Sequence, residues 1–330
     1  MSMLAAQISK SGSAPKAVRV LPPAAPIHES EVQIRVIATG LHQVTRSRAE
    51  GKHDTSTSFP HTPGIDGTGI SISTGKLVYF TALTGTGSFA EIVNIPNSSV
   101  HELPPDVDPV QAAGLINPVM SSWMALRKRI DFLKGGQDPK PWACFILGAT
   151  SMSGKLAIKV ARLMGATRVI GAARNEDALR TLGLDDVIVL QDPPESTEFS
   201  HAADADVVLD YLYGPYFTNF FMSRSTLKAT NPITWVCIES VAGNFGTVAT
   251  AALRKRDVTI RGSGPGTWSF AEFEAEASGM LKVLEGVNEE GIRKVKLEDV
   301  ETEWDSKDGG SVVFVLDEGP APGFVSDVVA

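Results

Sequence analysis

One stretch near the middle of the chain limits the possible folds more than any other. Residues 145–175 read FILGATSMSGKLAIKVARLMGATRVIGAARN. The apolar run that ends at Leu147 predicts a buried strand, the small residues of 148–154 predict a tight turn, and apolar residues at helical spacing predict a helix over 153–164. The order of strand, glycine-bearing turn and helix is typical of the first unit of a dinucleotide-binding α/β fold.

The turn itself has the composition of a phosphate-binding loop. Small side chains allow backbone N–H groups and the amino end of the next helix to approach a pyrophosphate. The pattern is a degenerate form of G-x-G-x-x-G, so an ordinary strand-to-helix turn of another α/β domain stays open as the alternative. The residues predicted to contact the phosphates are Gly148, Ala149, Thr150, Ser151, Met152, Ser153 and Gly154.

Two polar residues at the end of the following strand bear on the choice of nucleotide. Arg174 stands 20 positions after Gly154 and is followed by Asn175. An NAD site usually has Asp or Glu there, whereas an arginine suits the 2′-phosphate of NADP. The sequence therefore predicts NADPH as the cofactor, with a solvated arginine at a strand end as the alternative.

The rest of the chain suggests where domains begin and end. Apolar strands that alternate with helical stretches predict a doubly wound parallel sheet over residues 118–262, opened by a helix that begins at Pro118. Residues 1–117 predict a mostly-β domain, with an irregular segment over 59–69 because it holds three glycines and two prolines. Residues 263–330 supply one helix and one strand and are expected to return to the first domain. The expected strands are 4–9, 17–21, 31–38, 76–80, 87–95, 142–147, 168–172, 187–190, 207–209, 234–238, 258–260 and 312–316.

Composition excludes several classes of function. With 43% apolar residues among 330, the chain can bury a substantial core. The 30 Lys and Arg against 38 Asp and Glu give a net charge of −8, which makes nucleic acid and anionic lipid poor partners. No apolar run approaches the roughly 18 residues that would span a membrane. The lack of a signal-like segment at the start and the presence of only two cysteines, Cys144 and Cys237, predict a cytoplasmic protein.

Several short blocks follow one another in order along nearly the whole chain. They are ATGLH at 38–42, PGIDGTG at 63–69, GSFAE at 87–91, the turn at 148–154, ARN at 173–175, DYL at 210–212 and GSG at 262–264. With these blocks the chain resembles the medium-chain dehydrogenase/reductase family, specifically its zinc-independent, quinone oxidoreductase-like branch. This resemblance implies a GroES-like catalytic domain over 1–117, a Rossmann NADP-binding domain over 118–262, and an active-site cleft between them.

Departures from the zinc-dependent members of that family predict that no metal is bound. His42 stands where those enzymes have a cysteine ligand, Ile65 replaces the histidine ligand, and Asp66 takes the place of the adjacent glutamate. The place of the third ligand, a cysteine, falls near Asn117 or Pro118. An isoleucine cannot bind zinc, and one His with one Asp make an incomplete site.

The resemblance implies an oxidoreductase that transfers hydride from NADPH to a conjugated C=C bond (an enone or enoyl group) or to a quinone. The candidate catalytic residues are His42, Tyr79 and Tyr211. His42 is a candidate proton relay or substrate-orienting group, Tyr79 a candidate to face the cleft, and Tyr211 is expected to line the cofactor rather than to give up a proton. Each has a structural alternative, namely a hydrogen-bonding histidine or a sheet aromatic. Backbone contacts to the nicotinamide amide are expected from Glu239, Ser240 and Ser263.

Two further expectations concern turnover and assembly. Because no proton donor is unmistakable, a scaffold of the same fold that binds cofactor but performs a cyclisation or isomerisation remains an alternative. The expected partner is a small-molecule substrate. Relatives often form homodimers by pairing their last Rossmann strand, here residues 257–261, whose charged ends flank the apolar Val258 and Ile260.

Overall fold

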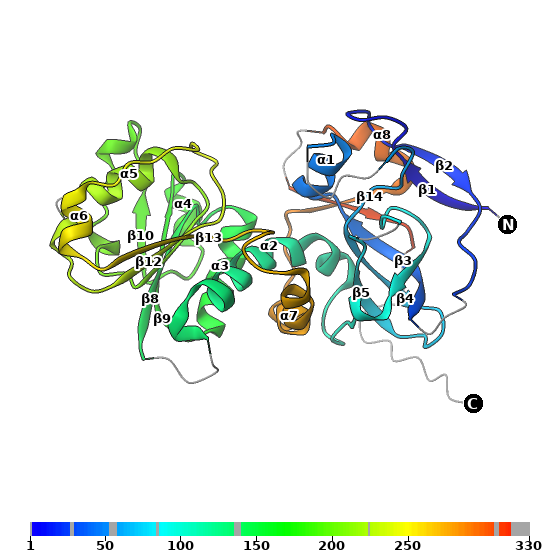
Figure 1. Ribbon diagram of the computed structural model, residues 1–330, viewed down its shortest axis with the longest axis horizontal. Coiled ribbons are helices and arrows are strands. Elements are labelled where there is room, and N and C mark those ends of the chain that lie inside the picture. Colours follow the sequence, from blue (N-terminus) through cyan, green and yellow to red (C-terminus); the bar gives the residue numbers. More distant parts are fainter. Residues whose placement is uncertain are drawn as a thin grey trace. The chain divides into compact units, whose positions relative to one another are not determined.

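The computed structural model describes residues 2–26, 30–52, 58–83, 86–134, 140–223, 225–306 and 310–317 (Figure 1). The chain divides into two compact units. Unit 1 comprises Met1–Asn117 and Glu274–Ala330, and unit 2 comprises Pro118–Phe273. Both divisions fall inside helices, and the domains expected from the sequence were 1–117, 118–262 and 263–330.

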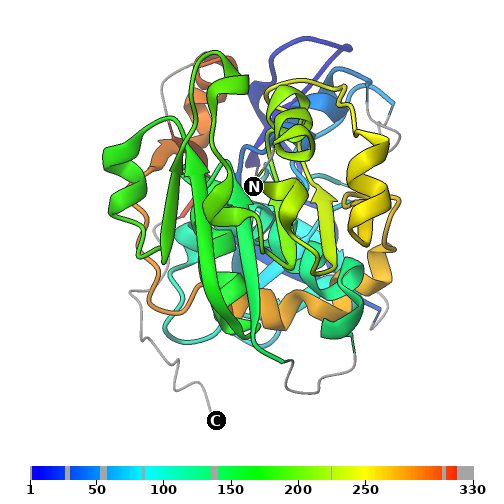
Figure 2. The same cartoon turned by 90° about the vertical axis from the view of Figure 1, so that its left-hand side faces the viewer.

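Unit 2 is built on a parallel sheet with strand order β10-β9-β8-β11-β12-β13 (Figure 2). Every neighbouring pair in it is parallel, as the continuously apolar strands predicted. This confirms the doubly wound fold. The strands are β8 (Trp142–Leu147), β9 (Ala166–Ala173), β10 (Asp186–Val189), β11 (Val207–Asp210), β12 (Ile233–Cys237) and β13 (Val258–Gly262).

Helices pack on this sheet through apolar faces. In α3 the side chains of Leu156 and Val160 are buried at i, i+4 spacing, and the helix contacts β8 and β9. Aromatic rings fill the core on the side of α5, where Phe220 lies 4.9 Å from Trp235 and 6.2 Å from Phe145 between ring centroids. The helices of unit 2 are α3 (Met152–Leu163), α4 (Glu176–Arg180), α5 (Gly214–Met222) and α6 (Thr250–Lys255).

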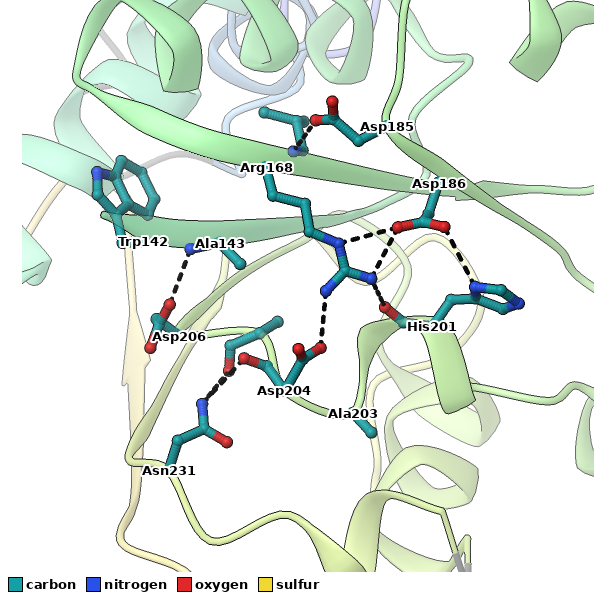
Figure 3. Close-up of polar contacts among 12 residues, drawn as sticks. Trp142, Ala143, Arg168, Asp185, Asp186, His201, Ala203, Asp204, Asp206 and Asn231 are labelled. Atoms are coloured by element: carbon teal, nitrogen blue, oxygen red, sulfur yellow. Dashed lines mark hydrogen bonds and ion pairs between the residues drawn. The ribbon is translucent and has the colours of Figure 1, made fainter. Parts of the chain in front are cut away.

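The amino ends of the parallel strands are tied together by charged side chains (Figure 3). The guanidinium of Arg168 donates to Asp186 at 2.9 Å and to Asp204 at 2.8 Å, and His201 lies 3.2 Å from the other oxygen of Asp186. Asp206 accepts from the amide of Ala143 at 2.8 Å. These contacts are satisfied within unit 2, so we assign this edge of the sheet a structural role.

Unit 1 is built on a mostly antiparallel sheet with order β14-β15-β3-β4-β5-β7, in which β6 also pairs with β3, and on a separate pair of strands, β1 and β2. The returning strand β15 pairs antiparallel with β3 and parallel with β14. The strands are β1 (Met3–Gln7), β2 (Lys16–Val20), β3 (Glu31–Gly40), β4 (Asp66–Ser71), β5 (Leu77–Thr81), β6 (Ile92–Pro96), β7 (Val100–Glu102), β14 (Ile292–Lys296) and β15 (Ser311–Val315).

Further α-helices belong to unit 1 or contain a division between the units. Both α2 and α7 contain such a division, at Asn117/Pro118 and at Phe273/Glu274 respectively. These helices are α1 (Gln43–Ala49), α2 (Pro109–Arg129), α7 (Phe270–Val283) and α8 (Val300–Glu303). Short 3₁₀ turns lie at Asn97–Ser99, Asp131–Leu133, Pro194–Ser196, Ser200–Ala202, Thr226–Lys228 and Leu297–Asp299.

The prediction that 59–69 is irregular was wrong for its last part, because β4 begins at Asp66. Glycine is used here for close approach between strands. A Cβ on Gly67 would lie 2.8 Å from the carbonyl oxygen of Ala38, and one on Gly69 would lie 2.4 Å from that of Arg35. Both glycines therefore allow β4 to pair with β3, although glycine usually weakens a strand.

Two further boundaries were wrong. Pro118 does not open a helix but lies inside α2, which begins at Pro109. The preference of proline for the first turn is local, whereas buried residues such as Ala112, Ala113 and Leu115 continue the helix on its amino-terminal side. The strand expected over 87–95 begins only at Ile92. At the start of the expected range the backbone of Gly87 packs against Thr62, where a Cβ would lie 2.2 Å from the carbonyl oxygen.

Candidate functional site

The predicted cofactor residues of unit 2 lie at one edge of its sheet. Each follows a strand directly, and because all these strands are parallel, their carboxyl ends meet at the same edge. The segments are 148–154 after β8, Arg174 and Asn175 after β9, Tyr211 after β11, Glu239 and Ser240 after β12, and Ser263 after β13. The fold therefore brings to one edge the residues that sequence reasoning selected along more than a hundred positions.

The turn after β8 has the geometry of a phosphate cradle. Gly148 has a φ of 101°, which favours glycine, and a Cβ on Gly154 would lie 2.3 Å from the carbonyl oxygen of Gly148. The hydroxyl of Ser151 caps α3 by accepting from the amide of Gly154 at 3.0 Å. Among the described residues, the amides of Met152 and Ser153 have no protein acceptor. The first turn of α3 thus presents free N–H groups where an anion is best bound.

The two residues chosen to recognise a 2′-phosphate are both exposed. Arg174 follows the last residue of β9. Asn175 is the N-cap residue of α4, and its side-chain oxygen accepts from the amide of Ala178 at 3.0 Å. This capping bond leaves the amide NH₂ of Asn175 as the group available to a ligand.

Tyr211 lies inside unit 2. Its side chain is 3% exposed, and its hydroxyl lies 3.1 Å from that of Ser121 on α2. Burial raises the pKa of the Tyr211 phenol, so it keeps its proton. These contacts favour a structural role for its side chain.

The three remaining cofactor candidates differ in their contacts. Glu239 is exposed, and its amide donates to the backbone oxygen of Asp210 at 3.2 Å. The hydroxyl of Ser240 donates to the side chain of Asn244 at 2.6 Å. The amide of Ser263 donates to the backbone oxygen of Cys237 at 2.9 Å, so this amide is already bonded within unit 2.

Asp210 organises the same edge, and sequence reasoning gave it no role. It is fully buried, and its carboxylate accepts from the amides of Leu212 (2.9 Å) and Tyr213 (2.7 Å) and from Nε1 of Trp235 (2.8 Å). Burial raises the pKa of Asp210 to about 6 although these donors lower it. Tyr213 has a φ of 54°, a conformation that L residues rarely adopt, so the Asp210 carboxylate holds a strained turn.

In unit 1 the predicted residue His42 occupies the junction between β3 and α1. It is the N-cap residue of α1 by position, but its side chain makes no capping bond. The ring is 8% exposed and lies against the end of β3, where a Cβ on Gly40 would come within 2.5 Å of its Nε2. Glycine at position 40 is therefore required for the ring to sit there.

Asp66 joins the two candidate catalytic residues of unit 1. Its Oδ1 lies 3.0 Å from Nε2 of His42, and its Oδ2 accepts from the hydroxyl of Tyr79 at 3.1 Å. All three side chains are buried. Sequence comparison aligned His42 and Asp66 with separate parts of a zinc site, and the structure shows that they are bonded to each other. Tyr79, which the sequence analysis expected to face a cleft, points its hydroxyl into this buried cluster.

A second carboxylate lies on the other side of Tyr79. The ring of His101 stacks beside that of Tyr79 with 6.5 Å between centroids, and Glu274 of α7 binds both Nε2 of His101 and the hydroxyl of Thr81. Burial, followed by the charges of Asp66 and Glu274 and the bond to Asp66, raises the pKa of the Tyr79 phenol well above its usual value. Tyr79 is therefore a fixed hydrogen-bond donor.

The alternation of β5 offers a signal that sequence reasoning did not use. Val78 and Phe80 pack in an apolar core, while Tyr79 and Thr81 point to the opposite, polar face. On that face Tyr79 is opposite Thr68 of β4 and His101 of β7. Thr81, a polar residue two positions after Tyr79 in an otherwise apolar strand, therefore indicated in the sequence that this face of β5 is polar.

In the described parts of the chain, no three His, Cys, Asp or Glu side chains come together as a metal site requires. No helix in these ranges is both long enough and apolar enough to cross a membrane.

Comparison with known proteins identifies relatives of this chain. No family model matches it. The chain is 31% identical, over an alignment of 343 positions that includes gaps, to the "Probable NADPH-dependent quinone reductase tdiC" of Emericella nidulans, and the alignment covers 89% of this chain and 95% of that protein. Over 179 residues it is 29% identical to a chloroplastic NADPH-dependent alkenal/one oxidoreductase of Arabidopsis thaliana, which covers 48% of this chain and 45% of that protein.

Solved structures agree on the fold. The quinone oxidoreductase of Thermus thermophilus, described alone and in complex with NADPH, matches with a TM-score of 0.69 and 21% identity over 95% of this chain and 100% of that one. The quinone oxidoreductase of Pseudomonas syringae pv. Tomato DC3000 matches with a TM-score of 0.69 and 19% identity, again over 95% and 100%. The chain belongs to the quinone oxidoreductase-like branch of the medium-chain dehydrogenase/reductase family.

Proposed function

We propose that this protein is an NADPH-dependent reductase that transfers hydride to a conjugated C=C bond or to a quinone. The observation that carries the proposal is the match, over 89% of this chain and 95% of the relative, to a protein named as an NADPH-dependent quinone reductase. The free amides at the start of α3 and the arginine that follows β9 support the cofactor assignment. The acceptor is a small molecule of one of these two classes, and the activity test described below is designed to identify it.

Residues of unit 2 would hold the cofactor. The backbone of 148–154 fits a pyrophosphate because Gly148 and Gly154 leave no side chain in the cradle and the amides of Met152 and Ser153 are free to donate. Arg174 would pair with the 2′-phosphate, assisted by the NH₂ of Asn175. When bound, NADPH supplies the hydride. Glu239, Ser240 and Ser263 stay proposed as contacts of the nicotinamide end.

Residues of unit 1 would supply the proton. Hydride addition to a conjugated acceptor leaves an electron pair that must be protonated, and an imidazole is well suited to that step near neutral pH. His42 is our candidate donor because it is held by a buried carboxylate. Tyr79 is assigned to support of that carboxylate, and the side chain of Tyr211 to the packing of unit 2.

We propose further that the reaction uses no metal, that the protein is cytoplasmic and that it is a homodimer. The donor set supports the first point, because the hydrocarbon side chain of Ile65 cannot bind zinc. Cys144 and Cys237 are both free thiols, in keeping with a reducing compartment. For the third, β13 ends the sheet order of unit 2, and its Ile260 is 43% exposed, so a second copy could pair with this edge.

The test follows loss of nicotinamide absorbance with a panel of quinones and enones, for NADPH and NADH separately. We expect turnover with NADPH and weaker binding of NADH. Arg174→Ala should reduce the preference for NADPH, by about tenfold for loss of one charge-assisted contact worth ~1.4 kcal/mol. Arg19→Ala, on the exposed face of unit 1, is the matched control. NADPH binding without oxidation by any acceptor would contradict the reductase proposal.

A further inference from the structure

We infer that Asp66 is a positioning residue that fixes Nε2 of His42 and so makes Nδ1 the nitrogen that gives the proton to the substrate. The inference rests on the proposed reductase function and adds to it the atom that acts and the residue that selects it. It starts from the 3.0 Å contact between Nε2 and Oδ1 of Asp66. A carboxylate accepts from N–H, so this contact places a proton on Nε2 in both charge states of the ring.

Asp66 is itself held from several directions. Tyr79 donates to Oδ2 at 3.1 Å, and the hydroxyl of Thr39 donates to the backbone oxygen of Asp66 at 2.7 Å. Thr39 in turn shares a hydrogen bond with Ser88. Asp66 is 2% exposed. With Oδ2 occupied by a phenol that keeps its proton, Oδ1 remains for His42, and the carboxylate cannot rotate without losing a buried bond.

The other nitrogen of His42 is left for chemistry. Among the described residues, Nδ1 of His42 has no hydrogen-bond partner. The ring keeps a small exposed fraction of 8%, so it is not sealed from its surroundings. An imidazole bound at one nitrogen by a carboxylate and open at the other is the arrangement by which a histidine is oriented for proton transfer.

The charged and titratable groups around the ring come from several elements. Asp66 of β4 contacts it directly, and Tyr79 of β5, His101 of β7 and Glu274 of α7 follow behind the carboxylate. On α1, next to the ring, two arginines have other acceptors. They are Arg46, whose Nε donates to the backbone of Trp304, and Arg48, which donates to the backbone of Leu83.

The proposed step couples hydride addition to the acceptor with proton transfer from His42. Hydride adds to one carbon of the conjugated acceptor, its π electrons move toward the carbonyl, and the Nδ1–H bond of the His42 imidazolium breaks as a new C–H or O–H bond forms. The ring becomes neutral and retains its Nε2–H bond to the Asp66 carboxylate, and uptake of a proton from bulk solvent then restores the Nδ1–H bond.

The first experiment compares Asp66→Asn with wild type in the pH dependence of kcat. In Asp66→Asn the side-chain oxygen accepts from Tyr79, so the side-chain NH₂ group turns toward Nε2 of His42. Nε2 must then be unprotonated in order to accept, and the acid at Nδ1 loses the stabilising charge of the carboxylate. We expect kcat to fall about 10- to 100-fold, part of the contribution of a general acid. The descending limb of the rate–pH profile should move to lower pH, while the KM for NADPH stays unchanged. Asp299→Asn, an exposed residue of unit 1, is the matched control.

The second experiment does not depend on turnover. Nitrogen chemical shifts of the His42 ring report which nitrogen carries the proton when the ring is neutral. We expect Nε2–H in the wild type and in Tyr79→Phe, and Nδ1–H in Asp66→Asn. A neutral wild-type ring protonated at Nδ1, or an unchanged profile in Asp66→Asn, would overturn the inference. If the wild type oxidises NADPH with none of the quinones and enones in the panel, the reductase proposal fails. The nitrogen chemical shifts of the His42 ring still decide whether Asp66 selects the tautomer.

Discussion

The buried carboxylate of Asp210 should give unit 2 a pH dependence of stability that is opposite to that of most acidic residues. Its pKa is raised from 3.8 to about 6 in the folded protein, chiefly by burial. In the window between these values the folded state holds a proton that the unfolded state has released. The free energy of unfolding contributed by this group is therefore largest at acidic pH and is lost as pH rises toward 6.

The size of the effect follows from the shift. A difference of roughly two units corresponds to about 3 kcal/mol in full, of which about 2 kcal/mol is lost between roughly pH 4.5 and 7. Asp210→Asn removes the titration. The amide that replaces the carboxylate has only one oxygen, so its NH₂ group faces either Nε1 of Trp235 or the amide of Tyr213, and that donor loses its acceptor. The loss costs about 1–3 kcal/mol, and this cost does not depend on pH.

The assay is denaturant unfolding at a series of pH values, followed by tryptophan fluorescence, for wild type and Asp210→Asn. The other titrating groups are common to both proteins, so the difference in unfolding free energy isolates Asp210. We expect that difference to shrink by about 2 kcal/mol from roughly pH 4.5 to 7. A constant difference across the range would refute the argument that burial outweighs the three donors.

Packing leads to three more expected outcomes. Gly154→Ala should destabilise unit 2 and weaken NADPH binding, because its Cβ would lie 2.3 Å from a backbone oxygen. Gly262→Ala is the control, because its Cβ would have nothing within 4 Å. Thermal melts and cofactor titrations compare the two variants. Phe220→Ala should cost about 3–5 kcal/mol in chemical denaturation because it removes a ring from the aromatic core. In a crystal structure, one ordered water should occupy the cavity of about 10 Å³ beside Thr45 Oγ1 and His61 Nδ1, two buried atoms that have no hydrogen-bond partner among the described residues, and Thr45→Val should remove it.

The parts of the fold that were predicted well are those where one local property decides the outcome. The apolar run from Trp142 to Leu147 can only be a buried strand in an α/β unit, and its bounds were correct. The turn after it was recognised because Gly148 and Gly154 have both a conformational and a packing role. The parts that failed depend on what the segment meets in space, as at Gly67 and Gly69, where glycine permits close strand approach instead of breaking the strand.

The same contrast applies to the candidate site. His42 and Tyr79 were selected one at a time, by residue type and by resemblance. The bonds that connect them run through Asp66, which is 24 positions from one and 13 from the other, and Glu274 is 173 positions from His101. No local pattern encodes such distances, because they arise from strand pairing and from the packing of α7 in unit 1.

The order of strands in unit 1 has a consequence for synthesis on the ribosome. Unit 2 is one continuous stretch, whereas unit 1 needs β14 and β15, which are made after all of unit 2. Until then the edge of β3 that pairs with β15 has no partner, and the ring of Phe314 is missing from its place 5.2 Å from Phe89. Unit 2 can therefore fold first, while the earliest part of the chain waits with an open strand edge. A chain terminated just before β14 would keep the dinucleotide fold and lose the unit that carries His42.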